Sequence, residues 1–315
     1  MFPGLFALMS RRANHRSSAH STSPDCQLAW HTRLVLIILV LLLNSCSMLR
    51  LGYGQGPHLF WWWLDSYVDF NPQQTPQVKE AIQQWFRWHR HTQLTGYATW
   101  LANLRSNLDD PATAQQICTT VESFRQTIAP ALDRMLTLGA PLIPTLESAQ
   151  LDHLERRYAK VNEEFRQDFL QPQPAERLQA SIQRTVKRVE NIYGPISESQ
   201  HALIATRIQT SPYNPEAWLD ERQRRQQETL QSLRQLAAEP GNTDDIVAVL
   251  RTLIEHLERS SHPQYRAYQI QLADYNCAFI AEVHNSTTTV QRHHARDKLK
   301  NWENDLRMLA HTTHQ

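Results

Sequence analysis

The stretch "LDHLERRYAKVNEEF", residues 151–165, decides the fold class of this chain. Its apolar positions follow one another at intervals of three or four residues: Leu151, Leu154, Tyr158, Val161 and Phe165. That spacing puts them on one face of an α-helix and the charged residues on the other face. The same spacing recurs at Val78, Ile82, Trp85 and Phe86, and at Ile246, Leu250, Leu253, Ile254 and Leu257. Amphipathic helices are therefore predicted along most of the chain.

Strand signals are missing beyond Arg50, where no run of alternating β-branched residues lies between glycine turns. Glycine itself is scarce, with eight residues in a chain of 315. Turns with proline divide the helical stretches, at 71–76, 109–111, 139–144, 171–174, 194–195, 211–215, 239–242 and 262–263. One helix is expected to run from the first of these turns to about Leu108. We predict an all-α fold, either a multi-helix bundle or an array of helical hairpins, with about eight to ten helices.

An apolar run of ten residues, Leu34 to Leu43, lies near the start of the chain. As a helix it spans about 15 Å, roughly half the hydrocarbon thickness of a bilayer, so it is too short to cross one. It also lacks the polar periodicity of a core helix. Arg33 precedes the run, and a basic residue before a short apolar block is typical of a secretory signal.

The residues that end this run, Leu43-Asn44-Ser45-Cys46, resemble the lipobox of bacterial lipoproteins. The resemblance implies cleavage between Ser45 and Cys46 and attachment of fatty acyl chains such as palmitate at Cys46, whose thiolate is the nucleophile. Two or three acyl chains anchor a protein stably in a membrane. An ordinary cleaved signal with an incidental cysteine is the alternative. The 33 residues before the run are either an extended basic region or sequence translated upstream of the true start.

Removal of residues 1–45 leaves 270 residues, enough for one large domain or two small ones. We expect a cleaved signal at 1–45, a lipidated tether at 46–57 and a single all-α periplasmic domain at 58–310. The mature chain carries 28 Lys and Arg against 30 Asp and Glu residues, a net charge of −2. That balance argues against nucleic acid as a partner. Cys118 and Cys277 are interpreted as separate buried thiols, although pairing in an oxidising compartment stays open.

Four predicted helix starts are alike: "FNPQQ" at 70–74, "LESAQ" at 146–150, "ISESQ" at 196–200 and "TTTVQ" at 287–291. In three of them an Asn, Ser or Thr is placed to cap the helix, and the final glutamine is placed to bond back to the cap. This is the capping-box arrangement. Glu147 is a poorer cap, so we expect Thr145 or Ser148 to take that role. The motifs either only start helices or mark repeated helical hairpins.

Repeated starts of this kind are similar to those of periplasmic chaperones of the Spy and CpxP type, although none has the full Leu-Thr-x-x-Gln form. Those chaperones are all-helical and independent of ATP, so the resemblance implies a chaperone-like role.

A more specific resemblance covers nearly all of residues 46–310. The segments that carry it are Arg50-Leu51-Gly52-Tyr53, Asp65-Ser66-Tyr67-Val68-Asp69, Trp88-His89-Arg90 and the stretches 154–170, 218–233 and 262–276. They resemble an uncharacterised proteobacterial lipoprotein family, domain of unknown function 6279. The resemblance supports lipidation but implies no activity.

Trp61, Trp62 and Trp63 form an aromatic cluster close to the expected lipid. Tryptophan favours the interface between bilayer and water, so this cluster is a candidate membrane or partner contact. Core packing against the aromatic residues at 85–88 is the alternative. Asp65 and Asp69 follow one helical turn apart and would repel each other if both were exposed. Either basic side chains pair with them, or they serve a site, as interaction residues or as carboxylates suited to acid–base chemistry.

Other polar clusters receive a simpler interpretation. The charged runs at 155–168 and 221–228 are expected to be solvated helix faces. The histidines at 89–91 and 293–294 point to different helix faces, so we expect no metal and no cofactor.

We therefore expect an outer-membrane-anchored lipoprotein that faces the periplasm and binds, holds or scaffolds envelope proteins. Ser47 after the cysteine favours the outer membrane over the inner one, by resemblance to lipoprotein sorting. An enzyme is the less favoured class: a hydrolase of envelope material that uses Asp65 and Asp69. A structural spacer in an envelope assembly is the third alternative.

Overall fold

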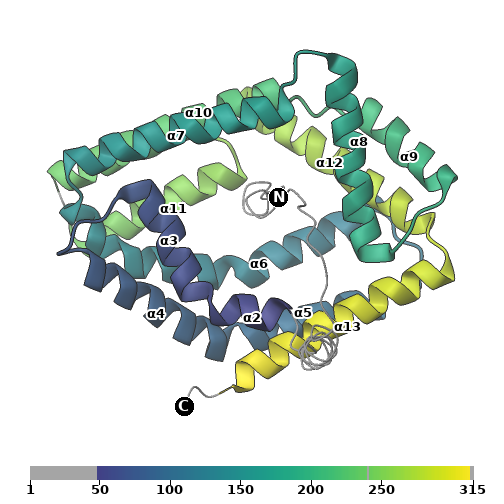
Figure 1. Cartoon of the computed structure of the whole chain (residues 1–315), viewed down its shortest axis with the longest axis horizontal. Coiled ribbons are helices and arrows are strands. Elements are labelled where there is room, and N and C mark those ends of the chain that lie inside the picture. The colour runs from purple at the N-terminus through teal and green to yellow at the C-terminus, as the bar shows by residue number, and fades with distance from the viewer. Residues whose placement is uncertain (1–47, 240, 313–315) are drawn as a thin grey trace, which may run out of the picture. The chain divides into compact units, whose positions relative to one another are not determined.

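The computed structural model describes residues 48–239 and 241–312, which belong to one compact unit (Figure 1). Every regular element in these residues is a helix, so the predicted all-α fold is confirmed. The expected signal at 1–45 and the lipidation residue Cys46 lie outside the described residues. Among the described helices, none combines the length and the apolar character that crossing a bilayer requires.

The described residues form twelve α-helices and one short 3₁₀-helix, more than the eight to ten helices predicted. In chain order they are α2 (Met48–Gly54), α3 (Gly56–Val68), α4 (Thr75–Thr92), α5 (Leu94–Ser106), α6 (Ala114–Gly139), η2 (Ala140–Thr145), α7 (Ser148–Phe169), α8 (Pro174–Tyr193), α9 (Glu198–Gln209), α10 (Pro215–Ala238), α11 (Thr243–Glu258), α12 (Pro263–Asn285) and α13 (Thr289–His311).

Two breaks account for much of the difference in helix number. The helix expected to reach Leu108 is divided at Gln93, because α4 packs on α3 and α6 whereas α5 packs along α13. Residues 48–57, expected to form a tether, are already helical from Met48. A new helix starts after Gly54 because Pro57 lies in the first turn of α3, where proline removes no intrahelical hydrogen bond.

Most predicted turns coincide with observed helix starts. The side chain of Asn214 accepts a hydrogen bond from the backbone N–H of Ala217 at 2.9 Å and caps α10. Asn242 caps α11 in the same way, through the backbone N–H of Asp245 at 3.0 Å. Local capping chemistry therefore fixes these boundaries, at positions where the sequence predicts turns.

The buried core is divided into small clusters between pairs of helices. Leu151 and Leu154 on α7 pack against Leu230 and Leu233 on α10, and Figure 1 shows these two helices side by side along their length. A second cluster joins η2, α10 and α11, and a third joins the end of α5 to α13. The periodic residues that predict helix α7 thus form its buried face.

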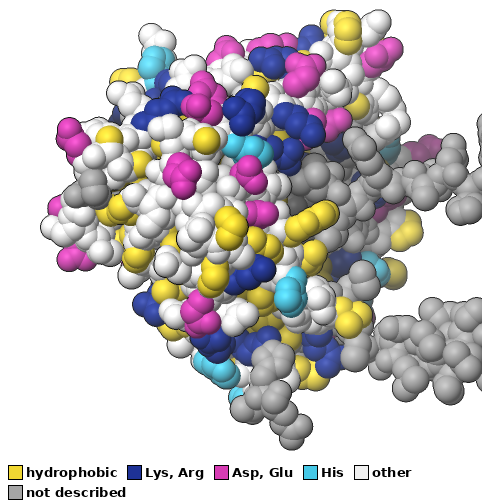
Figure 2. Space-filling model, turned by 60° about the vertical axis from the view of Figure 1, so that its left-hand side comes forward, with side chains coloured by type: hydrophobic (Ala, Val, Ile, Leu, Met, Phe, Trp, Pro, Cys, Tyr) yellow, Lys and Arg dark blue, Asp and Glu magenta, His cyan; other side chains and the backbone are white. Residues whose placement is uncertain are grey.

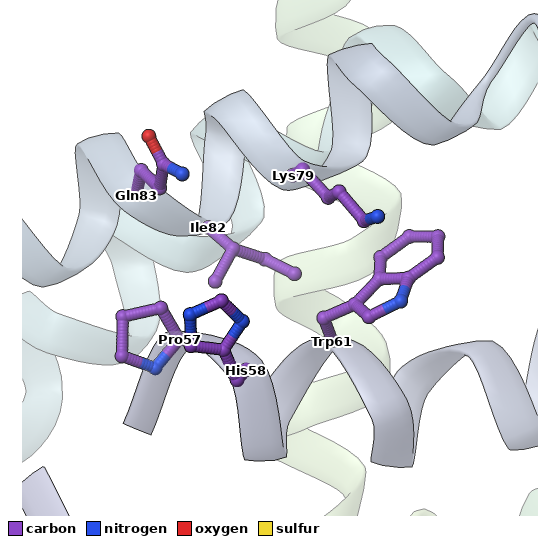
Figure 3. A pocket seen from close by; sticks show the side chains of 6 residues that line it. All are labelled: Pro57, His58, Trp61, Lys79, Ile82 and Gln83. Carbon is purple, nitrogen blue, oxygen red and sulfur yellow. The ribbon is translucent and has the colours of Figure 1, made fainter. Parts of the chain in front are cut away.

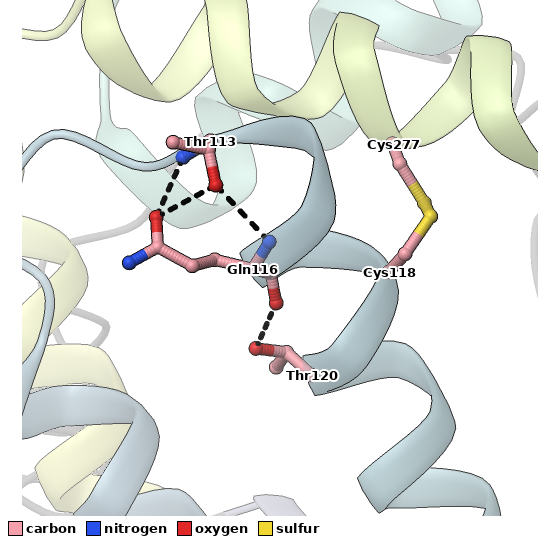
Figure 4. The surroundings of a disulfide bond; sticks show 5 residues. All are labelled: Thr113, Gln116, Cys118, Thr120 and Cys277. Atoms are coloured by element: carbon pink, nitrogen blue, oxygen red, sulfur yellow. Dashed lines mark hydrogen bonds between the residues drawn. A yellow bond between two sulfur atoms is a disulfide. The ribbon is translucent and has the colours of Figure 1, made fainter.

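A disulfide between Cys118 and Cys277 joins α6 to α12 (Figure 4). The two Cα atoms lie 5.5 Å apart. Nearby, the side-chain amide of Asn285 bonds both the N–H and the carbonyl of Ala112, at 2.8 and 2.9 Å, so the two helices run antiparallel. The interpretation of separate thiols was wrong, because the fold brings together cysteines that lie 159 positions apart.

Candidate functional site

Helix α3 presents two different faces. Leu59 lies three positions before Trp62 and four before Trp63, and the three side chains have 46%, 76% and 38% of their surface exposed. The packed side begins next to Trp63, whose ring centre lies 5.1 Å from that of Tyr67, and the Tyr67 ring joins the buried cluster between α7 and α10. The three predicted tryptophans are therefore split between the two faces, since Trp61 lies on the packed side.

Trp61 forms one wall of a small pocket between α3 and α4 (Figure 3). Its ring stacks on Phe70 with the ring centres 5.7 Å apart, and Nζ of Lys79 lies 4.8 Å from the centre of the indole. The pocket measures about 100 Å³ and is lined by Pro57, His58, Trp61, Lys79, Ile82 and Gln83. A cation over an aromatic ring is a favourable contact, so Lys79 holds Trp61 against α4.

Tyr53, which sequence reasoning missed, takes the packing role expected of the tryptophans. Its ring meets that of Phe86 edge-on at 5.5 Å, and its hydroxyl lies 2.9 Å from Nδ1 of His89. His89 stacks on Trp85 with the ring centres 4.4 Å apart. Burial lowers the pKa of His89 to about 4 and raises the pKa of Tyr53 to about 12. This histidine is therefore neutral at physiological pH.

Asp65 and Asp69 end helix α3. A carboxylate oxygen of Asp65 accepts a hydrogen bond from the backbone N–H of Phe70 at 3.1 Å. Asp69 adopts a left-handed conformation with φ of 57°, and its N–H bonds the Asp65 carbonyl at 2.8 Å. A left-handed residue is a common helix stop. Within the described residues, neither carboxylate is paired with a basic side chain, and these contacts are those of a helix terminus.

The glutamines of the first two repeated motifs meet in the interior. Nε2 of Gln74 donates to Oε1 of Gln150 at 3.1 Å, and Nε2 of Gln150 donates back to Oε1 of Gln74 at 2.8 Å. Each Nε2 also donates to a backbone carbonyl, Gln74 to that of Thr145 at 2.6 Å and Gln150 to that of Asp69 at 3.0 Å. We call this pair of residues, Gln74 and Gln150, the first amide clasp.

The other two motifs build the second amide clasp, Gln200 and Gln291, in the same way. Both reciprocal amide hydrogen bonds measure 2.9 Å. Gln200 also donates to the carbonyl of Ser286 at 2.9 Å, and Gln291 to that of Pro195 at 2.8 Å. In all four cases the accepting carbonyl lies two residues before the cap of the partner motif. The two clasps therefore have the same arrangement of hydrogen bonds.

Each clasp glutamine also belongs to a helix cap. The Oε1 atom of Gln200 accepts the backbone N–H of Ser197 at 2.9 Å, and that of Gln150 accepts the N–H of Glu147 at 3.0 Å. Glu147 itself is the cap of α7, so the expectation that Thr145 or Ser148 caps this helix was wrong. Thr145 instead accepts a hydrogen bond from the amide of the first clasp.

A fifth capping box was missed at the start of α6, in the sequence Ala112-Thr113-Ala114-Gln115-Gln116. Oε1 of Gln116 accepts the N–H of Thr113 at 2.8 Å, and Thr113 accepts the N–H of Gln116 (Figure 4). Gln116 is exposed and has no glutamine partner, whereas the four clasp glutamines are only 4–8% exposed. Capping alone therefore does not require burial, and the cross-pairing distinguishes the four clasp motifs.

The charged run at 221–228 is not simply a solvated face, as the sequence was interpreted. Glu221 is buried and receives two hydrogen bonds of 2.8 Å from Arg224 and one of 2.7 Å from the hydroxyl of Ser260. Burial alone would raise the pKa of Glu221, but the hydrogen bonds from Arg224 and Ser260 outweigh burial and lower it. The network fixes the turn before α12 to helix α10.

Hydrophobic side chains also gather on the surface. Figure 2 shows them across the lower middle of one face, with basic and histidine side chains at the border of the group. The histidines at 293–294 are exposed, and Nδ1 of His294 lies 3.0 Å from the carbonyl of Ile192. Among the described residues, no three His, Cys, Asp or Glu side chains are arranged as metal ligands.

These features define a class of protein: an all-helical, disulfide-linked domain whose helix starts are tied in pairs by buried amide clasps. The chain belongs to the family described as a family of unknown function, DUF6279, which matches residues 66–266. The predicted membership of this family of unknown function is confirmed for residues 66–266, whereas its lipoprotein character and the resemblance to Spy- and CpxP-type chaperones stay predictions. The match includes Gln74, Gln150 and Gln200 but ends before Cys277 and Gln291. No curated protein and no solved structure matches the chain.

Proposed function

We propose that this chain is a lipoprotein, anchored through Cys46 in the outer membrane, whose helical domain faces the periplasm. The disulfide between Cys118 and Cys277 is the observation that carries the proposal, because disulfides persist in oxidising compartments such as the periplasm. The lipobox resemblance at 43–46 supplies the anchor, and Ser47 favours the outer membrane.

In that compartment the domain binds or holds other envelope proteins and catalyses no reaction. Its long helices support this role because they bury few side chains completely: α6 has 26 residues, of which only Ala131 is buried. Phe124 on α6 and Ile270 on α12 are 41% and 55% exposed. Exposed apolar side chains on neighbouring helices offer contacts to an unfolded or amphipathic client.

The anchor is tested by growing cells that express the full chain with a radiolabelled fatty acid. We expect label on the protein and its recovery with outer membranes. The Cys46→Ser variant is expected to lose the label and leave the membrane fraction. Unlabelled wild-type protein would show that the anchor is assigned wrongly.

The holding activity is tested with the fragment 48–315, which contains every described core cluster, the disulfide and both clasps. At stoichiometric amounts it should suppress aggregation of an unfolded client. The double variant F124S/I270S should suppress aggregation less, whereas V290S, at a highly exposed valine of α13, should not differ from wild type. Absence of suppression by the wild-type fragment would refute the holding role.

A further inference from the structure

An exposed apolar stripe runs along the first two described helices. We define it by four residues, Leu51, Leu59, Trp62 and Trp63, of which Leu51 is 53% and Trp62 is 76% exposed. Large exposed aromatic side chains are unusual on a protein surface unless they contact a partner. The sequence groups three tryptophans together, but only Trp62 and Trp63 belong to this stripe.

The stripe follows one side of a nearly continuous helical backbone. The N–H of Gln55 bonds the carbonyl of Leu51 at 3.2 Å, and the N–H of Leu59 bonds that of Gln55 at 3.0 Å. Leu51, Gln55 and Leu59 therefore follow at single-turn intervals, and Trp62 and Trp63 continue the same side. The backbone bends between α2 and α3 but keeps turning across the junction.

Contacts on the packed side of α3 prevent this helix from rotating so that the stripe faces the protein interior. A Cβ atom added at Gly56 would lie 2.5 Å from the ring of Phe86, so the helix touches α4 there with its backbone. Further along, Trp61 is stacked on Phe70 and Tyr67 joins a buried cluster. Helix α3 is therefore fixed in rotation: Trp62 faces outward, and Trp63 lies at the edge of the stripe, partly exposed and in contact with the rings of Phe60 and Tyr67.

The position of the stripe in the chain indicates which kind of partner it contacts. Only Ser47 separates Cys46 from the first residue of α2, so an anchor at Cys46 lies within about 8 Å of that helix. Tryptophan favours the headgroup level of bilayers. His58, which is exposed one helical turn before Trp62, is available to lipid phosphates.

We propose that the apolar stripe inserts into the interface of a phospholipid bilayer, so that α2 and α3 lie along the membrane surface. The inference rests on the proposed anchoring at Cys46 and extends it: the lipid and the stripe together orient the domain. The acyl chains hold the domain at the membrane, and the stripe determines which side of the domain faces it.

The test uses fragment 48–315, purified with its disulfide intact, and vesicles of equal parts phosphatidylethanolamine and phosphatidylglycerol. The wild-type fragment should co-sediment with the vesicles, with a blue shift of its tryptophan emission. The double variant L59A/W62A should bind at least about tenfold more weakly, because it loses most of the exposed apolar area of the stripe. Trp62→Phe keeps an apolar ring and should retain most of the binding.

The matched control is I270A/V290A, which removes two apolar side chains that are 55% and 79% exposed on other helices. It should bind vesicles as wild type does. A wild-type fragment that stays in the supernatant, or equal binding by wild type and L59A/W62A, would overturn the proposal. If the fragment forms a dimer in the absence of vesicles and L59A/W62A is monomeric, the stripe would instead be the contact with a second copy of this chain. Because the fragment lacks Cys46, these outcomes are independent of the fatty-acid labelling experiment.

Discussion

Gln200 and Gln291 exchange both of their side-chain amide hydrogen bonds, although 91 positions separate them in the sequence. The same exchange joins Gln74 to Gln150, 76 positions apart. Helix α4 is thereby tied to α7, and α9 to α13. Buried polar groups that are fully hydrogen-bonded specify one arrangement, because any other leaves them unsatisfied. The clasps therefore fix which helix starts lie next to each other.

Substitution of one clasp residue should destabilise the protein strongly. In Gln291→Ala the buried amide of Gln200 keeps its bonds to Ser286 and Ser197 but loses both bonds to Gln291, and each group left unsatisfied costs about 1–3 kcal/mol of stability. The double variant Q200A/Q291A should cost less than the sum of the two single variants, by on the order of 1 kcal/mol. Urea unfolding of the four proteins measures both effects.

The exposed capping box at the start of α6 supplies a matched control. Gln116→Ala removes the same type of hydrogen bond to a helix cap, but it leaves no buried amide without a partner. This substitution should lower the free energy of unfolding by no more than about 1 kcal/mol. If Gln116→Ala proves as costly as Gln291→Ala, the clasps add nothing beyond ordinary helix capping.

The disulfide should contribute a large share of the stability. Opening it in C118S/C277S frees a loop of 159 positions in the unfolded chain, for which loop-closure entropy predicts a loss of up to about 5 kcal/mol. The measurement is the urea midpoint of wild type and double variant under oxidising conditions. Equal midpoints would show that the bond does not constrain the unfolded state.

Stability should fall as the pH is lowered from 6.5 to about 4. The pKa of His89 is lowered by burial to about 4, against 6.5 for an exposed histidine. Within this window the unfolded chain binds a proton that the folded chain does not, so stability is complete above pH 6.5 and decreases below it. The shift corresponds to at most about 3 kcal/mol.

Unfolding at several pH values tests this dependence. His89→Gln removes the titrating ring and should flatten the slope between pH 6.5 and 4. His293→Gln, at an exposed position, should leave the slope as it is in wild type. A slope unchanged by His89→Gln would assign the dependence to other groups, such as the carboxylates.

The buried carboxylate on α10 should be sensitive to loss of its partners. Ser260→Ala removes a hydrogen bond of 2.7 Å to Glu221 and should cost about 1–3 kcal/mol. Glu221→Ala leaves the half-buried cations of Arg224 and Arg225 without their shared partner and should cost about 3–5 kcal/mol. Thermal unfolding measures the loss of stability in each variant. A larger loss for Ser260→Ala than for Glu221→Ala would contradict the central role of Glu221 in this network.

The local parts of this fold were determined by the sequence. Helical periodicity predicts the buried face of α7, because a residue pattern of three and four depends only on the geometry of one helix. Capping residues predict the starts of α9 and α13, because each cap is a contact between residues three positions apart, and turns with proline predict those of α10 and α11. The family follows from motifs that are contiguous in the chain.

Contacts between distant segments were decided only by the tertiary structure. The sequence presents four similar glutamines but cannot say that they meet in pairs, since both reciprocal bonds depend on how helices pack. For the same reason, the sequence led to an interpretation of Cys118 and Cys277 as separate thiols. The sequence groups Trp61 with Trp62, and only the packing of α3 on α4 places Trp61 against Phe70 and leaves Trp62 exposed. Helix propensity depends on neighbouring residues, whereas the pairing and the exposure of side chains depend on which surfaces the folded chain brings together.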